Sequence, residues 1–152
     1  MALGLDLTAI DTTAEFKLGT IIDDIGTDGP CKAYKYIKYD AATAAVAGVA
    51  GEVAYYMATV ANTSVVTSDV SDANGIGAGV LQAALTDGTY GWVQVEGPAT
   101  LTIALTAGAD GNGLTAVGAG DGTLDVSALV SDFICAVADD ASAKTIMCMF
   151  PR

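Results

Sequence analysis

The sequence predicts an all-β protein, a small β-barrel or β-sandwich of about nine or ten short strands with an extended N-terminal arm. Short runs of alternating apolar and polar residues indicate strands. Turn signals such as Asp-Gly separate many of these runs at intervals of about 8–12 residues. The composition, 52% hydrophobic and 16% charged over 152 residues, excludes global disorder and suits one ordinary domain.

The N-terminal residues are expected to form an arm rather than part of the body. Four apolar side chains define its sticky face: Leu3, Leu5, Leu7 and Ile10. The alternation of the three leucines predicts an extended segment, which cannot fold alone and must lie on its own body or on a neighbouring protein. We therefore divide the chain into an arm, residues 1–15, and a single β-rich domain, residues 16–152.

Two strands are predicted in the first part of the domain, over residues 16–22 and 33–39, with a loop rich in turn-forming residues between them. The aromatic residues of the second run favour a strand. Residues 41–51 are mostly small and form either a short helix or a closely packed loop. Residues 53–60 predict a further strand, and the polar stretch 62–74 predicts a loop with a short strand inside it.

The strand signal is denser from residue 77 onward. Strands are predicted over residues 79–85, 90–96, 99–105, 114–117, 123–126, 133–138 and 144–150. Asp87-Gly88 is a hairpin signal, and Gly97-Pro98 is expected to end the strand before it.

The last predicted hairpin is apolar on both faces, which suggests that one face meets another subunit. The candidate interface residues are Phe133, Cys135, Val137, Ile146, Met147, Met149 and Phe150. The alternative is a central strand whose second face is sealed by the small-residue segment 41–51.

Charge and composition exclude several functions. The formal net charge of −12 disfavours binding to nucleic acid or to an anionic membrane. The absence of histidine removes the commonest general base and metal ligand, and with it catalysis by a Ser-His-Asp triad or a Cys-His pair. No targeting signal or transmembrane segment is recognised, so synthesis in the cytoplasm is expected.

The three cysteines, Cys31, Cys135 and Cys148, contain no CxxC spacing, so a zinc knuckle or thioredoxin-type site is excluded. They are interpreted as small buried hydrophobic residues. A single bridge between Cys135 and Cys148 across the last hairpin remains an alternative.

Acidic residues offer no convincing site. The Asp-Gly turns at Asp110 and Asp121 resemble a calcium β-roll only loosely and are interpreted as hairpin turns. The pairs Asp23–Asp24 and Asp139–Asp140 fall in predicted loops, where solvated turns are the simpler reading. Residues 75–79 lack the spacing of a nucleotide-binding loop. We therefore expect neither a metal nor a cofactor.

The basic residues and the aromatic residues can each be interpreted as a binding site or as ordinary surface or core residues. Lys32, Lys35 and Lys38 form either an anion-binding patch or single lysines on a solvated strand. Trp92 and the tyrosines form either a sugar-binding groove or, more simply, part of a barrel core.

One run resembles a known family. Residues 83–99, Ala-Ala-Leu-Thr-Asp-Gly-Thr-Tyr-Gly-Trp-Val-Gln-Val-Glu-Gly-Pro-Ala, look like the central signature of capsid decoration (cement) proteins of tailed bacteriophages. Residues 16–20 and 34–39 are also similar to those proteins, so the resemblance covers about residues 16–105.

The resemblance implies a structural role in the virion. Such proteins bind the outer surface of the capsid, stabilise contacts between major capsid protein subunits, commonly form homotrimers, and have no enzyme activity or cofactor. The chain is then made in the host cytoplasm, and we expect Leu3, Leu5, Leu7 and Ile10 to contact the capsid. A carbohydrate- or surface-binding β module of a viral fibre or adhesin is the alternative, and an enzyme that uses only Asp, Tyr and Lys is a third.

Overall fold

A computed structural model describes residues 4–24, 29–58 and 64–152 and confirms the all-β prediction. Its ten strands form one sheet. They are β1 (Ile21–Asp24), β2 (Lys32–Tyr39), β3 (Val53–Met57), β4 (Val65–Thr67), β5 (Ala73–Leu81), β6 (Tyr90–Thr100), β7 (Gly113–Thr115), β8 (Asp125–Val126), β9 (Ala136–Asp140) and β10 (Thr145–Met149). A single 3₁₀ turn, η1 (Val70–Asp72), is the one helical element in the described residues.

Part of the sheet closes on itself into a barrel-like ring. The ring runs through β2, β4, β3, β5 and β6, and β6 pairs back with β2. Only the β2–β4 pair is parallel. The ring closes where β5 meets β6, and Gly79 allows this close approach, since a Cβ there would lie 2.8 Å from the Gln94 carbonyl oxygen.

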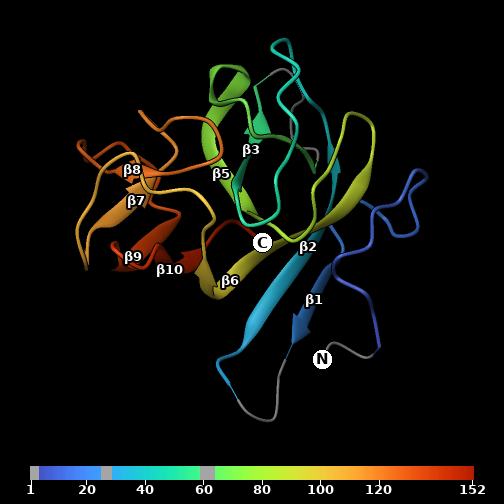
Figure 1. Cartoon of the computed structure of the whole chain (residues 1–152), viewed down its shortest axis with the longest axis horizontal. Coiled ribbons are helices and arrows are strands. Elements are labelled where there is room, and N and C mark those ends of the chain that lie inside the picture. The colour runs from blue at the N-terminus through green and yellow to red at the C-terminus, as the bar shows by residue number, and fades with distance from the viewer. Residues whose placement is uncertain (1–3, 25–28, 59–63) are drawn as a thin grey trace.

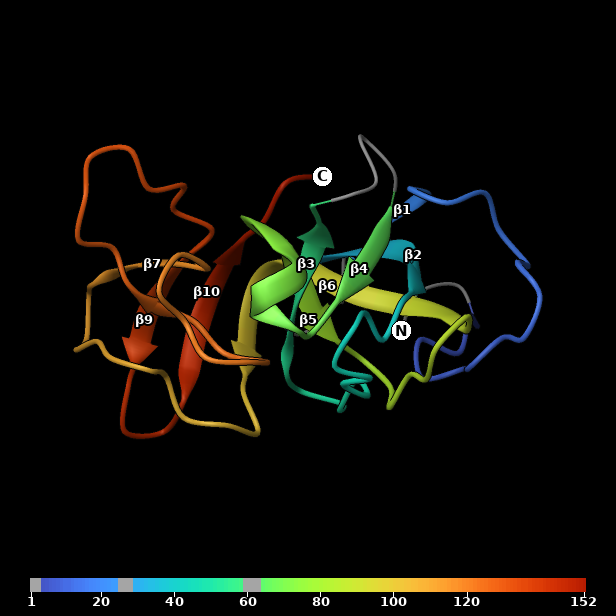
Figure 2. The same cartoon turned by 90° about the horizontal axis from the view of Figure 1, so that it is seen from above.

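The second half of β6 leaves the ring and carries an extension that we call the wing, made of β10, β9, β7 and β8 in spatial order. Figures 1 and 2 place the wing at one end of the long axis and the N-terminal segment at the other. The predicted strand end at Gly97-Pro98 is wrong, because β6 continues to Thr100. Gly97 takes a φ of 88°, so β6 is redirected there instead of ending.

The main hydrophobic core fills the ring and continues beneath the inner side of the wing. Gly77 of β5 marks the junction, since a Cβ there would lie 2.7 Å from the Phe150 ring and 3.0 Å from the Cys135 sulfur. The ring and the wing therefore share one core, and close packing at a glycine joins them.

Several element boundaries differ from the predictions. Phe16 lies in a bend, and the first strand begins only at Ile21. The small-residue segment 41–51 is a loop without helix, the second of its two expected forms. Aspartates hold its backbone: Asp87 accepts the amide of Ala41 at 3.1 Å, and Asp72 accepts that of Thr43 at 2.9 Å. These side chains offer the backbone partners that a helix would otherwise supply.

Candidate interaction surfaces

An aromatic cluster lies on the outer side of β2 and β6, and we call this surface the aromatic face. It consists of Tyr34, Tyr36 and Trp92, which are all buried. Tyr36 and Trp92 are directly paired across the two strands, with ring centroids 5.0 Å apart. Side chains alternate along β6, so Trp92 points outward and Val93 points into the main core. The sequence predicted the alternation, but it favoured a core position for Trp92.

The N-terminal segment covers the aromatic face. Leu5, Leu7, Phe16 and Leu18 pack against it. The Phe16 ring lies 5.2 Å from the Tyr36 ring and 5.3 Å from the Trp92 ring, in edge-on and tilted contacts typical of aromatic pairs. The segment thus removes from water an apolar patch that the sheet alone would expose.

Asp11 fastens this cover. The Tyr36 hydroxyl donates to Asp11 Oδ2 at 2.6 Å and accepts from the Glu15 amide at 3.2 Å. The backbones of Asp11 and Tyr90 exchange two hydrogen bonds, at 2.9 and 3.0 Å. Burial first, and then the hydrogen bond to Asp11, raise the pKa of Tyr36 to about 12. The hydroxyl therefore stays protonated and serves as a structural donor.

The predicted arm residues have different positions. Leu5 and Leu7 are half-buried on the chain's own body, which is the first of the two placements expected for the arm. Ile10 projects outward and is 50% exposed. Leu3 lies outside the described residues.

The aromatic and basic candidates do not form open sites. Trp92 belongs neither to a groove nor to the barrel interior, because it sits outside the ring under the N-terminal segment. Lys35 is buried and points to the opposite side of β2 from Lys32 and Lys38, where its Nζ donates to the Tyr56 hydroxyl at 2.7 Å. The three lysines therefore do not share one patch.

Among the residues that the structure describes, none covers the outer side of the wing in this way. Gly113, Val137, Met147 and Pro98 stand in register across β7, β9, β10 and β6 and form an uncharged row. Ile134 lies over Gly113, since a Cβ there would be 3.2 Å from Ile134 Cδ1. We call the apolar residues of this surface and its adjoining loop the wing face: Pro98, Leu129, Val130, Phe133, Ile134, Val137, Met147 and Met149.

The predicted interface residues divide between the two sides of the wing. Phe133, Met147 and Met149 are exposed, and Val137 is half-buried. The other three, Cys135, Ile146 and Phe150, are buried in the main core. Phe133 lies at the start of a predicted strand, but β9 begins only at Ala136.

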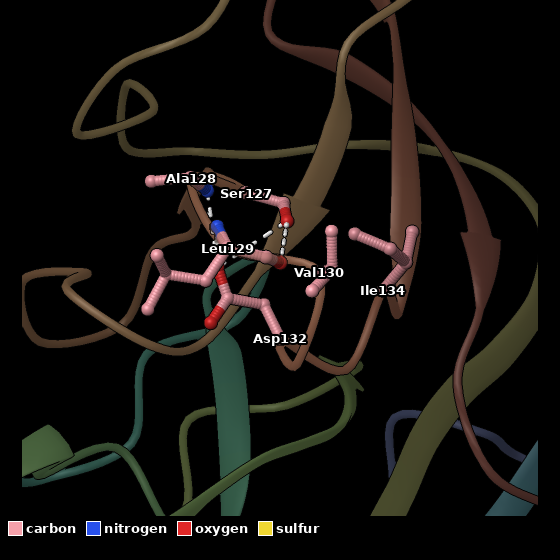
Figure 3. Close-up of a pocket in the computed structure, with 6 residues that line it drawn as sticks. All are labelled: Ser127, Ala128, Leu129, Val130, Asp132 and Ile134. Atoms are coloured by element: carbon pink, nitrogen blue, oxygen red, sulfur yellow. Dashed lines mark hydrogen bonds between the residues drawn. The ribbon is translucent and has the colours of Figure 1, made fainter.

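Three exposed residues of the wing face, Leu129, Val130 and Ile134, were missed. They belong to the β8–β9 loop, where Asp132 Oδ2 accepts the amides of Ala128 at 3.0 Å and Leu129 at 2.9 Å. Figure 3 shows this turn and the Val130 and Ile134 side chains lying side by side. A shallow hollow of about 370 Å³ adjoins them. The apolar pair Leu129 and Val130, which lies between two predicted strands, was the signal that could have identified this loop, whereas Ile134 was assigned to a strand.

Comparisons with protein-family models, with curated proteins and with solved structures find no match for this chain.

The cysteines are all free. Burial raises the pKa of the Cys135 and Cys148 thiols to about 12, so neither is a ready nucleophile or metal ligand at neutral pH. The bridge between them that the sequence left open is absent, and both behave as small core residues. Cys31 is exposed.

Three aspartates of the candidate sites accept hydrogen bonds from backbone amides or form an ion pair. Asp110 accepts the amide of Ala141 and Asp121 that of Val70, each at 2.9 Å. Asp23 lies in β1 rather than in the expected loop, because its backbone pairs with Ala33 of β2, and its side chain forms an ion pair with Arg152. In the part of the chain that the structure describes, no three acidic or thiol groups gather so as to hold a metal ion.

Glu52 is the acidic residue with the most unusual setting. Burial, reinforced by the nearby charge of Asp121, raises the pKa of its carboxyl. The carboxyl group packs against Gly122 in the bend before β8. Separately, no helix within the described residues has the length and apolar character needed to cross a bilayer.

Proposed function

We propose that this chain is a structural capsid decoration protein that binds the outer surface of a tailed-phage head and stabilises contacts between major capsid protein subunits. The observation that carries the proposal is the pair of candidate contact regions at opposite ends of one β-rich body. The N-terminal segment offers Ile10 at one end, and the wing face lies at the other. A protein that joins other proteins needs at least two contact regions on one rigid body.

The settings of the reactive side chains agree with this role. The two buried thiols are protonated, and the aspartates discussed above bind backbone amides or an arginine. We propose that the protein works by adhesion and is not an enzyme. Assembly as a homotrimer, which the resemblance implies, would multiply each contact with the capsid, so that modest individual contacts bind strongly together.

Binding to capsids tests the proposal. Tailed-phage heads assembled without this chain are mixed with the purified protein, sedimented, and imaged by electron microscopy. We expect the protein to sediment with the heads, to add density to their outer surface and to raise their resistance to heat. Heads that remain bare at saturating protein concentration would contradict the proposal.

The contribution of the N-terminal segment is tested separately. Because this segment covers the aromatic face, its deletion would disturb the fold as well as any capsid contact. Ile10→Asp changes an exposed side chain instead, and Val117→Asp, at a position 47% exposed, is the matched control. We expect Ile10→Asp to lower head occupancy and the control to leave it unchanged. Equal occupancy for both variants would exclude Ile10 from the contact.

The alternative of a carbohydrate-binding module is weakened, because the aromatic residues that would bind the sugar are not accessible. A sugar-binding strand would need its aromatic rings open to solvent, whereas Tyr34, Tyr36 and Trp92 are buried. A glycan array with the purified chain is the appropriate check, and strong selective binding there together with bare heads would favour this alternative.

A further inference from the structure

We propose that Asn74 is a modification site, at which the side-chain amide is lost spontaneously and aspartate and isoaspartate form. The inference goes beyond the proposed function and concerns a chemical change within the chain. Its test needs no capsid, so either proposal can fail without the other.

The reaction uses only the chain and water. The backbone nitrogen of Gly75 loses its proton to a base and attacks Cγ of Asn74, so that a nitrogen–carbon bond forms. The bond between Cγ and Nδ2 then breaks, and Nδ2 takes up a proton and leaves as ammonia. The product is a cyclic imide. Water opens this imide at either of its two carbonyl carbons, which leaves aspartate or isoaspartate in the chain.

The backbone around Asn74 departs from the regular ladder. The flanking pairs in the sheet are Ala73 with Met57 and Gly77 with Tyr55. Between them, residues 74–76 of β5 lie opposite Tyr56 alone, which makes a bulge. Gly75 has no Cβ to hinder approach to its nitrogen, and its φ is 82°. Asn74 is exposed, so water and base reach its amide.

The side chain of Asn74 is folded toward the backbone nitrogen that attacks it. Its Oδ1 accepts the amide of Ile76 at 3.0 Å. The ring that this hydrogen bond closes contains the Gly75 nitrogen, so Cγ and that nitrogen are held near each other before they react. The same hydrogen bond stabilises the negative charge that develops on Oδ1 as the nitrogen adds to Cγ.

A second Asn-Gly step, Asn112-Gly113, is held in a different way. Asn112 Oδ1 accepts the amide of Ala109 at 2.8 Å, which ties the side chain to a preceding residue instead of a following one. The backbone carbonyl of Asn112 accepts the amide of Ala138 at 2.9 Å, and Ile134 lies over Gly113. We therefore expect this step to resist the reaction, and it serves as an internal control.

Each product changes β5. Both products add a negative charge to a chain whose net charge is already −12. Isoaspartate also routes the main chain through Cβ, which inserts an extra atom into the strand shortly before Gly77, where the ring and the wing pack together. We expect isoaspartate to be the more destabilising of the two products.

Ageing of the full chain in mildly alkaline buffer tests the inference, because base promotes the attack by the Gly75 nitrogen. A protease that cleaves before aspartate releases residues 72–86 and 110–120, which hold one Asn-Gly step each. Mass spectrometry follows both fragments. Formation of aspartate creates a new cleavage site, whereas isoaspartate raises the mass of the fragment without creating one.

The two asparagines should react at different rates only while the chain is folded. We expect Asn74 to convert at least about tenfold faster than Asn112, since a misplacement of reacting atoms by about 1 Å already costs about 100-fold. In concentrated urea the two rates should become similar, because both steps are then free of the fold. Equal rates in the folded chain, or no conversion of Asn74, would overturn the proposal.

Substitutions locate the reaction. Asn74→Ser removes the amide at an exposed position and keeps an oxygen near the amide of Ile76, and Asn112→Ser is the matched control. Ion-exchange chromatography separates the acidic forms that accumulate on ageing. We expect Asn74→Ser to lose most of these forms and Asn112→Ser to keep them. If Asn74→Ser accumulates them as fast as the unaltered chain, the modification lies elsewhere and the proposal fails.

Discussion

The aromatic face and the wing face are outer surfaces of the same sheet, but only the first is covered by the chain itself. The N-terminal segment packs four apolar side chains on the aromatic face and fastens them through Asp11. The wing face has comparable apolar residues and no such cover among the described residues. Apolar surface on a sheet is stabilised when it leaves water, either within one chain or between chains. The difference indicates which surface belongs to folding and which is available for association.

The largest expected effect concerns Trp92. Trp92→Ala removes the centre of the aromatic cluster and should lower the free energy of unfolding by about 3–5 kcal/mol, the usual range for a buried large aromatic residue. Phe133→Ala, on the wing face, is the matched control and should cost far less in the monomer. Denaturation by urea measures both. Similar losses for the two variants would contradict the distinction between a covered and an uncovered face.

Gly97 tests the junction where β6 passes from the ring to the wing. A Cβ there would lie 2.4 Å from the Cys31 carbonyl oxygen, and φ is 88°. Gly97→Ala should therefore cost about 2–4 kcal/mol, from strain and overlap together. Gly111→Ala has a similar φ of 82° with no atom within 4 Å of the added Cβ, so it reports strain alone. If the two variants unfold at the same denaturant concentration, the overlap with the Cys31 carbonyl oxygen adds nothing to the cost of backbone strain.

Asp11→Ala tests the fastening of the N-terminal segment. Loss of the hydrogen bond from Tyr36 should cost about 2 kcal/mol, because the acceptor is a carboxylate. Because the folded pKa of Tyr36 is about 12, above that of a free tyrosine at about 10, the folded state holds this proton more tightly, and stability should fall as pH rises between these values.

In Asp11→Ala the folded pKa of Tyr36 should fall toward that of free tyrosine, so the pH range over which stability falls should become narrower. Burial still keeps this pKa above the free value. Tyrosinate absorbance and unfolding curves measured together would show it. Asp6→Ala, which removes only hydrogen bonds to Thr8 two residues away, is the control. An unchanged titration in Asp11→Ala would exclude the proposed coupling.

The smallest expected effect is at Glu52, whose partly buried carboxyl packs against Gly122 before β8. Its raised pKa means that the folded state binds a proton more tightly than the unfolded state, so stability declines as pH rises through the folded value. Glu52→Gln removes this loss, so the variant should be slightly more stable at neutral pH, and the gain should vanish in acid. Thermal unfolding across pH measures the gain, with Glu15→Gln, at an exposed position, as the control for charge. A gain that persists in acid would contradict this explanation.

Much of the fold was predictable because it depends on local pattern. The strand pairs around Asp87-Gly88 and in the last hairpin follow from alternation and turn residues, which act over short distances in the sequence. The continuation of β6 through Gly97-Pro98 was not predictable, because a glycine and a proline usually end a strand and the partner that sustains this one, β10, lies far along the chain. The β8–β9 loop was missed for a similar reason: Asp132 and the packing of Ile134 on Gly113, not periodicity, determine its form.

The sequence by itself determined the all-β class, the alternation of Trp92 with Val93 along one strand, and the absence of histidine chemistry, since composition and period-two alternation are properties of the chain alone. Only the tertiary structure decided which apolar side chains are covered. Leu5 packs against the aromatic cluster, Phe16 contacts Trp92, and Cys135 lies beside Gly77, through contacts between segments distant in the sequence. Whether an apolar residue is buried depends on what packs against it, and that partner is known only when the chain has folded.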